Sequence, residues 1–125
     1  MPIINRFKDG EFEEAPIPTT LEEAFDVLDE IIFPDERDLV LEYSEEMWRA
    51  QSYRMGGWLR NTWKFWEKEG PLYEWFVDYG ITHADDMSGI VLLSYWRHKN
   101  GKSLDVEGQV QHYLDYWDKR EFERI

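Results

Sequence analysis

The sequence predicts an all-α protein: a compact bundle of six or seven short helices around an aromatic-rich core, with an extended N-terminal arm. Apolar residues recur at spacings of three and four in several segments, and no segment shows the strict alternation of a half-buried strand. The 125 residues include 7 Trp, 7 Tyr and 7 Phe, and each such ring buries a large area in a small core. The chain has no cysteine, which excludes disulfides, zinc–thiolate sites and a thiol nucleophile.

Residues 1–18 are predicted to form the arm, and residues 19–125 the single helical domain. The arm contains three prolines and one glycine and shows no sustained periodicity. The first helix is expected to begin after Thr20, with Glu23 three residues later completing a capping box. Its apolar face repeats with helical spacing at Leu21, Phe25, Leu28 and Ile32.

A second, short helix is expected directly after the first. Pro34 ends the first helix, because proline cannot continue the backbone hydrogen bonding. Asp35 and Glu36 then open the second helix, in which Leu39 and Leu41 are the residues to bury.

The middle of the chain predicts two helices that carry aromatic residues. Ser44 is the expected N-cap of the first, which carries Trp48 and is predicted to break or kink at Gly56-Gly57. The second is predicted over residues 58–68. Aromatic residues lie on both of its sides, so we expect it to be a central helix packed from two directions.

Glycine and proline mark the ends of the following helix. Gly70 closes the preceding segment, Pro71 suits the first turn of the new helix, and Gly80 is its expected C-cap. Its apolar stripe consists of Leu72, Trp75, Phe76 and Tyr79.

Two more helices complete the chain. A second capping-box pattern, with Thr82 as N-cap and Asp85 three residues later, predicts the first of them, which stops at Asn100-Gly101. The last helix begins near Asp105, and its expected inward face consists of Val106, Val110, Tyr113, Leu114 and Trp117.

Only one group of residues resembles a reaction centre: His83, Asp85 and Asp86. A helix start accounts for both aspartates, because the positive end of the helix dipole favours negative charge there. We expect them to serve this start and an ion pair with Arg60 or Arg97. A metal or acid–base site and a binding contact are the alternatives. The spacing converges poorly on one ion and the other two histidines are isolated, so we predict no metal and no cofactor.

The net charge of −13 is concentrated in one segment. Residues 9–46 hold fifteen acidic residues and one basic residue, whereas residues 47–125 carry a net charge of −1. Such a block repels nucleic acid and anionic membranes and favours a basic protein partner, although a solvated helix face that aids solubility is the alternative. The candidate binding residues are Glu22, Asp26, Asp29, Glu30, Asp35 and Glu36.

Other catalytic and targeting signals are missing from the sequence. No serine lies in a nucleophile-elbow pattern, and the glycine pair at 56–57 does not belong to a phosphate-binding loop. The N-terminus lacks the apolar region of a signal peptide, and no apolar run approaches the length of a membrane span. We therefore expect a cytoplasmic protein without membrane association.

Three signature-like segments resemble a small bacterial domain of unknown function. They are Trp58-Leu59-Arg60-Asn61-x-Trp63-x-x-Trp66 and Gly80-Ile81-x-His83-x-Asp85-Asp86-Met87-Ser88-x-Ile90, followed by Ser94-Tyr95-x-Arg97-x-x-Asn100-Gly101-Lys102. The resemblance spans about residues 21–102, and the chain departs from it at Leu59, Thr62, Ala84 and Trp96. It implies a shared constellation of Arg60, Asn61, His83, Asp85, Asp86 and Arg97, but no activity. A histidine is expected where Trp96 stands, which argues further against a paired-histidine metal site.

The sequence favours a non-enzymatic interaction protein whose acidic segment binds a basic protein surface. Small acidic domains of this kind serve as immunity proteins, toxin neutralisers or phage-type inhibitors that mimic nucleic acid. The alternative is a small hydrolase or nucleic-acid-processing enzyme that uses His83, Asp85 and Asp86 with Arg60 or Arg97. A third possibility is a structural subunit whose exposed aromatic residues build an oligomer; the oligomeric state itself is not predicted.

Overall fold

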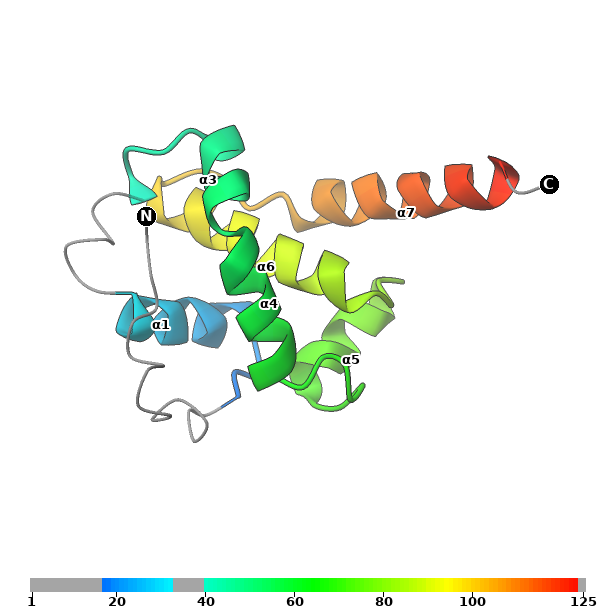
Figure 1. Cartoon of the computed structure of the whole chain (residues 1–125), viewed down its shortest axis with the longest axis horizontal. Coiled ribbons are helices and arrows are strands. Elements are labelled where there is room, and N and C mark those ends of the chain that lie inside the picture. The colour runs from blue at the N-terminus through cyan, green and yellow to red at the C-terminus, as the bar shows by residue number, and fades with distance from the viewer. Residues whose placement is uncertain (1–16, 33–39, 124–125) are drawn as a thin grey trace.

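The computed structural model describes residues 17–32 and 40–123, and every regular element in these ranges is a helix (Figure 1). The all-α class and the aromatic-rich core are confirmed for this part of the chain. The arm up to residue 16 and the predicted second helix around Asp35 and Glu36 lie outside the described residues. In chain order the helices are α1 (Leu21–Ile31), α3 (Glu45–Gln51), α4 (Tyr53–Thr62), α5 (Pro71–Asp78), α6 (Ala84–Lys99) and α7 (Val106–Glu123).

Helix α6 is the central element, and α1, α3, α4 and α7 all pack against it. It is apolar on nearly every side, which is the pattern of a helix buried from several directions. The prediction placed the central helix at residues 58–68, and that position was wrong. The buried apolar side chains of α6 include Met87, Ile90, Val91, Leu92, Leu93, Tyr95 and Trp96.

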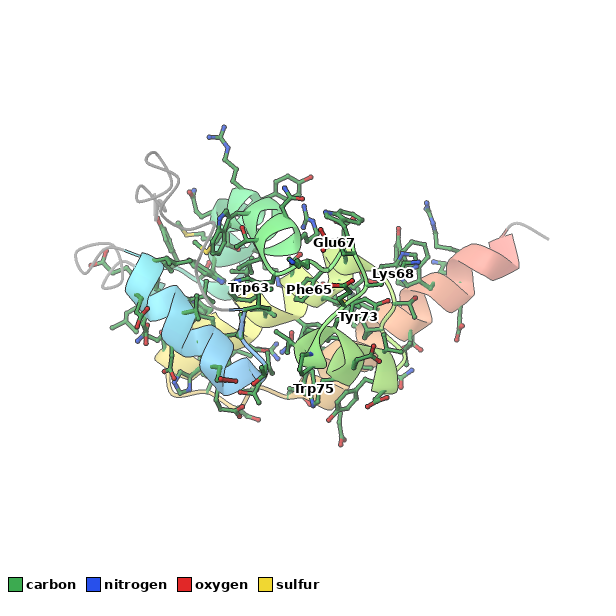
Figure 2. All side chains as sticks on the ribbon, turned by 90° about the horizontal axis from the view of Figure 1, so that it is seen from below. Trp63, Phe65, Glu67, Lys68, Tyr73 and Trp75 are labelled. Atoms are coloured by element: carbon green, nitrogen blue, oxygen red, sulfur yellow. The ribbon has the colours of Figure 1, made fainter. Side chains whose placement is uncertain are left out.

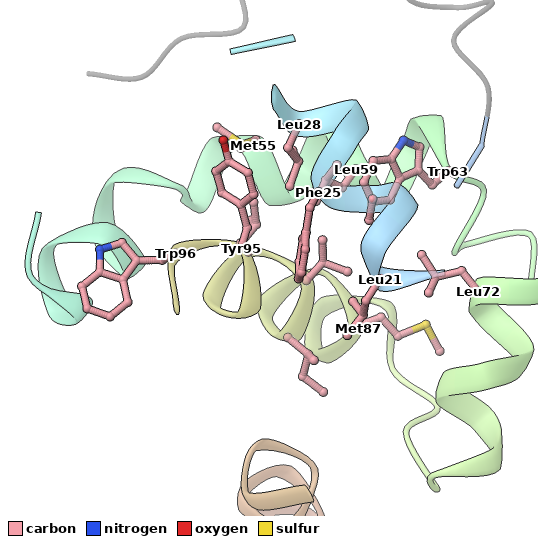
Figure 3. Packing of buried hydrophobic residues seen from close by; sticks show 14 of the residues in the cluster. Leu21, Phe25, Leu28, Met55, Leu59, Trp63, Leu72, Met87, Tyr95 and Trp96 are labelled. Carbon is pink, nitrogen blue, oxygen red and sulfur yellow. The ribbon is translucent and has the colours of Figure 1, made fainter. Parts of the chain in front are cut away.

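Helix α1 closes one side of the core with the face that its periodicity predicts. Leu21, Phe25, Leu28 and Ile32 are all buried. Figure 3 shows the Phe25 ring extending from α1 to α6, where its centroid lies 6.1 Å from that of Tyr95. The amphipathic pattern of this helix therefore gave the right buried face.

The predicted N-caps of α1 and α3 are confirmed. The Thr20 hydroxyl accepts a hydrogen bond from the Glu23 backbone N–H at 3.1 Å, and the Ser44 hydroxyl accepts one from the Met47 backbone N–H at 3.1 Å. The Glu23 carboxylate mainly reaches Thr19, whose backbone N–H lies 3.1 Å away and whose hydroxyl also donates to it. These hydrogen bonds, above all the one from the Thr19 hydroxyl, lower the pKa of Glu23.

The break predicted at Gly56-Gly57 lies instead at Ser52, between α3 and α4. The glycine pair continues helically inside α4. A Cβ atom added at Gly56 would lie 3.1 Å from Arg60 Nη1 and 3.4 Å from Ser88 Oγ. The glycine thus allows α4 to approach α6 closely, which is a packing role and not a helix-breaking role.

Helix α4 ends at Thr62, so the helix predicted over residues 58–68 was too long. In the turns that follow, Lys64 and Lys68 have φ values of 61° and 60°, in the left-handed region that no helix continues through. Trp63 and Phe65 are buried nevertheless, and Figure 2 shows them near the middle of the molecule. Trp66, another aromatic residue of the predicted helix, is 57% exposed.

The short stretch before α3 corrects one predicted core residue. Val40 is fully buried, whereas Leu41 is 54% exposed. The two are neighbours in the chain, and their side chains point in different directions, so burying Val40 turns Leu41 outward. Leu39 lies outside the described residues.

Helices α5 and α7 complete the molecule. Pro71 is the first residue of α5, as predicted, and Gly80, with φ of 92°, follows its C-cap Tyr79. Helix α7 begins at Val106 and packs against α6, and its C-terminal part extends away from the other helices (Figure 1). Val110 is the buried apolar residue of its predicted inner face, and Gln109 beside it donates to Ser94 Oγ at 3.0 Å.

Candidate functional site

Most of the acidic residues of α1 lie away from its buried stripe. Glu22, Asp26 and Glu30 are exposed. Asp29 differs from them, because its Oδ1 atom accepts a hydrogen bond from the Tyr95 hydroxyl at 2.8 Å and lies 2.9 Å from Lys99 Nζ. Asp29 is therefore engaged within the fold. The other candidate binding residues, Asp35 and Glu36, lie outside the described residues.

Helix α6 begins with a different cap from the one predicted. Its N-cap is His83, in an extended conformation and without a side-chain capping bond, so the capping box starting at Thr82 was wrong. The His83 carbonyl accepts from the backbone N–H groups of Asp86 and Met87, both at 3.1 Å. Asp85 and Asp86 stand in the first turn of α6, where the helix dipole favours their charge.

Asp86 turns toward α7 and is buried. Its Oδ2 atom accepts a hydrogen bond from Trp117 Nε1 at 2.8 Å, and the His83 ring stacks on the Trp117 ring with centroids 3.9 Å apart. No arginine pairs with Asp86 among the described residues, so the ion pair proposed for it was wrong. Burial raises the pKa of the Asp86 carboxyl, and the Trp117 hydrogen bond opposes this only in part.

Asp85 turns the other way, toward α4. Its Oδ1 atom lies 3.1 Å from Arg60 Nε, in an ion pair without the alignment of a hydrogen bond, and its side chain is 72% exposed. Arg60 Nη1 donates to Ser88 Oγ at 2.8 Å, and the Ser88 hydroxyl donates to the Asp85 carbonyl at 2.9 Å. Arg60, Asp85 and Ser88 therefore form one connected polar group between α4 and α6.

Arg97 belongs to a separate contact at the other end of α6. Its Nη2 and Nε atoms lie 2.7 and 2.9 Å from Glu45 Oε1, and its Nη1 atom donates to the Leu104 carbonyl at 2.8 Å. Asn61 is exposed. The six residues of the predicted constellation thus occupy several places in the fold and do not share one site.

This geometry does not assemble a catalytic group from His83, Asp85 and Asp86. The two carboxylates contact different helices, Asp85 at Arg60 of α4 and Asp86 at Trp117 of α7, and no hydrogen bond among the described residues joins His83 to either of them. The Ser88 hydroxyl is occupied by Arg60 and by the Asp85 carbonyl, so no general base among the described residues activates it. In the same residues no group of three or more His, Asp or Glu side chains could hold a metal ion.

A pocket of about 320 Å³ lies beside the Arg60 group, between α3, α4, α6 and α7. Sequence reasoning did not identify it, although it noted Arg60 on α4 and Asp85 on α6, because the lining also takes residues from α3 and α7. Small residues at helical positions 56, 88 and 89 were the available signal, since they leave space between packed helices. The lining residues that sequence reasoning did not connect with a site include Arg49, Ser52, Tyr53, Gly56, Gly89 and Tyr113.

Comparison with protein families finds one match. The family described as Domain of unknown function (DUF6794) matches residues 17–99, which include α1 to α6 and exclude α7. The expected kinship with a domain of unknown function is confirmed at that level. No curated protein and no solved structure matches the chain. No helix in the described ranges is long and apolar enough to cross a membrane, and the cytoplasmic location stays a prediction.

Proposed function

Because the chain belongs to the DUF6794 family, whose description names no activity, we propose a function from its own surface: it is a non-enzymatic protein that binds a basic protein through the acidic outer face of α1. The exposure of Glu22 and Asp26 on that face carries the proposal. Neither residue forms a hydrogen bond or ion pair with another described residue. Their charges are therefore available to a partner.

The charge distribution supports the same face. Residues 9–46 contain fifteen of the 27 acidic residues of the chain, and α1 lies within this segment. Clustered carboxylates repel one another, and a cationic partner relieves that repulsion on binding. Electrostatic attraction of this kind accelerates association and weakens with salt.

The proposal has a finer form, in which the carboxylates stand in for phosphate groups. The partner is then a protein whose basic surface binds nucleic acid, and the domain acts as an inhibitor of the immunity or phage type. Such basic surfaces bind polyanions largely through charge, so a rigid helix bearing carboxylates competes with a nucleic acid for them.

Two double charge reversals test the proposal. Glu22→Lys with Asp26→Lys changes α1, and Glu74→Lys with Asp78→Lys is the matched control on α5. All four residues are exposed, and both pairs are one helical turn apart. Each variant replaces one glutamate and one aspartate by lysine, so the two variants have the same net charge. Binding of a labelled arginine-rich peptide at low salt should weaken about tenfold in the α1 variant and by less than about twofold in the control. Equal weakening in both variants would leave only an effect of net charge and contradict the proposal.

Competition tests the finer form separately. The parent protein should displace duplex DNA from a basic DNA-binding protein, and the α1 variant should do so at a concentration about tenfold higher. If the peptide result holds but no displacement occurs with several such proteins, the acidic face binds basic protein without mimicking nucleic acid.

A further inference from the structure

The lining of the pocket beside Arg60 carries more positive than negative charge, although the chain as a whole is acidic. Two guanidinium groups, from Arg49 on α3 and Arg60 on α4, line it, and Asp85 is its one carboxylate. The pocket volume of about 320 Å³ is at the lower end of the range for small-molecule sites. The local charge therefore favours an anionic ligand, whereas the partner proposed for the α1 face is basic.

Glycine residues on two helices shape the pocket. A Cβ atom at Gly89 would lie 2.7 Å from the Tyr113 hydroxyl oxygen, and one at Gly56 would lie 3.1 Å from Arg60 Nη1. Each polar group therefore lies against the backbone of a glycine. A larger residue at either glycine position would displace that polar group. The Tyr113 hydroxyl and the Arg60 guanidinium consequently converge on the same hollow from α7 and from α4.

Several hydrogen-bond donors in the pocket have no partner among the described residues. Arg60 uses Nη1 for Ser88 and directs Nε toward Asp85, which leaves Nη2 without a hydrogen bond. The Arg49 guanidinium and the Tyr113 hydroxyl make none with those residues. Burial chiefly, with the nearby Asp86 charge, raises the pKa of Tyr113, so its hydroxyl stays protonated and able to donate. These donors are suited to an oxyanion.

The remaining walls of the pocket are apolar and aromatic. Trp48 and Tyr53 come from α3 and α4, and Leu92 and Leu93 from α6. Flat rings pack well against such walls, while their charged substituents need a polar group at a fixed place. The pocket thus has an apolar part for a ring and a cationic part for a charge.

We propose that this pocket binds a small aromatic anion, with its carboxylate or phosphate oxygen atoms on the Arg49 and Arg60 guanidiniums and its ring against the aromatic wall. Planar guanidinium groups match the oxygen geometry of both anions. The site is separate from the α1 face, and it adds a small-molecule ligand to a protein proposed to bind another protein.

Calorimetric titration with indole-3-carboxylate and phenyl phosphate tests the site, with neutral indole-3-carboxamide as the matched compound. At least one anion should bind the parent protein with a Kd of about 1 mM or tighter, and the amide at least about tenfold more weakly. Carboxylate binding alone, or phosphate binding alone, would identify which oxyanion the pocket accepts.

Variants locate the binding. Arg49→Gln should weaken binding of the anion about tenfold and Tyr113→Phe several-fold, because each removes a donor without a structural partner. Arg54→Gln removes the same charge from an exposed position outside the pocket lining and should leave binding unchanged. Arg60→Gln is less decisive, since Arg60 also links α4 to α6.

Three results would overturn the proposal. They are binding of the amide as tight as that of both anions, equal losses in the Arg49 and Arg54 variants, and no saturable binding of either anion up to about 10 mM. Failure of the α1 charge reversals would not affect it, because those residues do not line the pocket.

Discussion

Asp85 and Asp86 are adjacent in the sequence but have different environments. A helix rotates by about 100° per residue, so neighbouring side chains point to different partners. Asp85 is exposed beside Arg60, whereas Asp86 is buried against Trp117 of α7. The sequence indicated that both carboxylates belong to a helix start. It could not indicate the Trp117 contact, because the two residues are 31 positions apart and nothing in their spacing connects them.

The contact with Trp117 changes the effect expected of Asp86→Asn. An ion pair with arginine would have made the substitution cost about 1 to 3 kcal/mol. The asparagine Oδ1 atom still accepts from Trp117 Nε1, and the buried negative charge is removed. We therefore expect the free energy of unfolding at pH 7 to stay within about 0.5 kcal/mol of the parent value, or to rise.

The pH dependence of the same variant has a definite sign. Burial raises the pKa of Asp86 in the folded protein, so the stability that its protonated form contributes is fully present below about pH 3.9, the unfolded value. That contribution is lost as the pH rises through the folded pKa. Urea unfolding from pH 4 to pH 7 should thus show the parent losing stability relative to Asp86→Asn. A loss of about 2 kcal/mol or more in the variant at pH 7 would instead indicate a cationic partner for this carboxylate.

At the scale of helices, amphipathic periodicity predicted the buried face of α1 correctly, whereas the glycine pair led to a wrongly placed helix break. The buried face of α1 and the start of α5 at Pro71 followed from the sequence, because each depends on local pattern. Gly56-Gly57 was interpreted as a break, yet the pair lies inside α4. A glycine that allows close packing against another helix cannot be distinguished by sequence from a glycine that ends a helix. Only the tertiary contact with α6 distinguishes them.

The two glycines of α4 should respond differently to alanine. Alanine favours a helix over glycine by about 1 kcal/mol, and a Cβ at Gly57 meets only Arg60 Nη2 at an ordinary 3.6 Å. Gly57→Ala should therefore raise the free energy of unfolding by about 0.5 to 1 kcal/mol. Gly56→Ala should give less, about zero, because its Cβ would displace the Arg60 nitrogen that is bonded to Ser88. Urea unfolding compares the two variants directly, and a larger gain at Gly56 would show that Arg60 is not held there.

The whole molecule combines an acidic outer face on α1 with a cationic pocket between α3, α4, α6 and α7. The acidic segment was evident from composition alone, since charge counts do not depend on folding. The pocket was not evident, because Arg49, Arg60 and Tyr113 come from three helices that only the packing around α6 brings together. The sequence therefore predicted the acidic segment of this protein but not the pocket.

Salt should affect folding and partner binding in opposite directions. The carboxylates of the acidic segment repel one another in the folded protein, and the screening length falls from about 30 Å at 0.01 M salt to about 10 Å at 0.1 M. Over that range we expect the thermal unfolding midpoint to rise by about 2 to 5 °C, as about 1 kcal/mol of repulsion is screened.

Association with a basic partner should slow over the same range, because the attraction that accelerates it is screened too. In Glu22→Lys with Asp26→Lys the midpoint at low salt should be unchanged or higher, and its rise with salt smaller than in the α5 control. A midpoint that falls with salt, or an equal rise in both variants, would show that repulsion on the α1 face is not a significant cost to this fold.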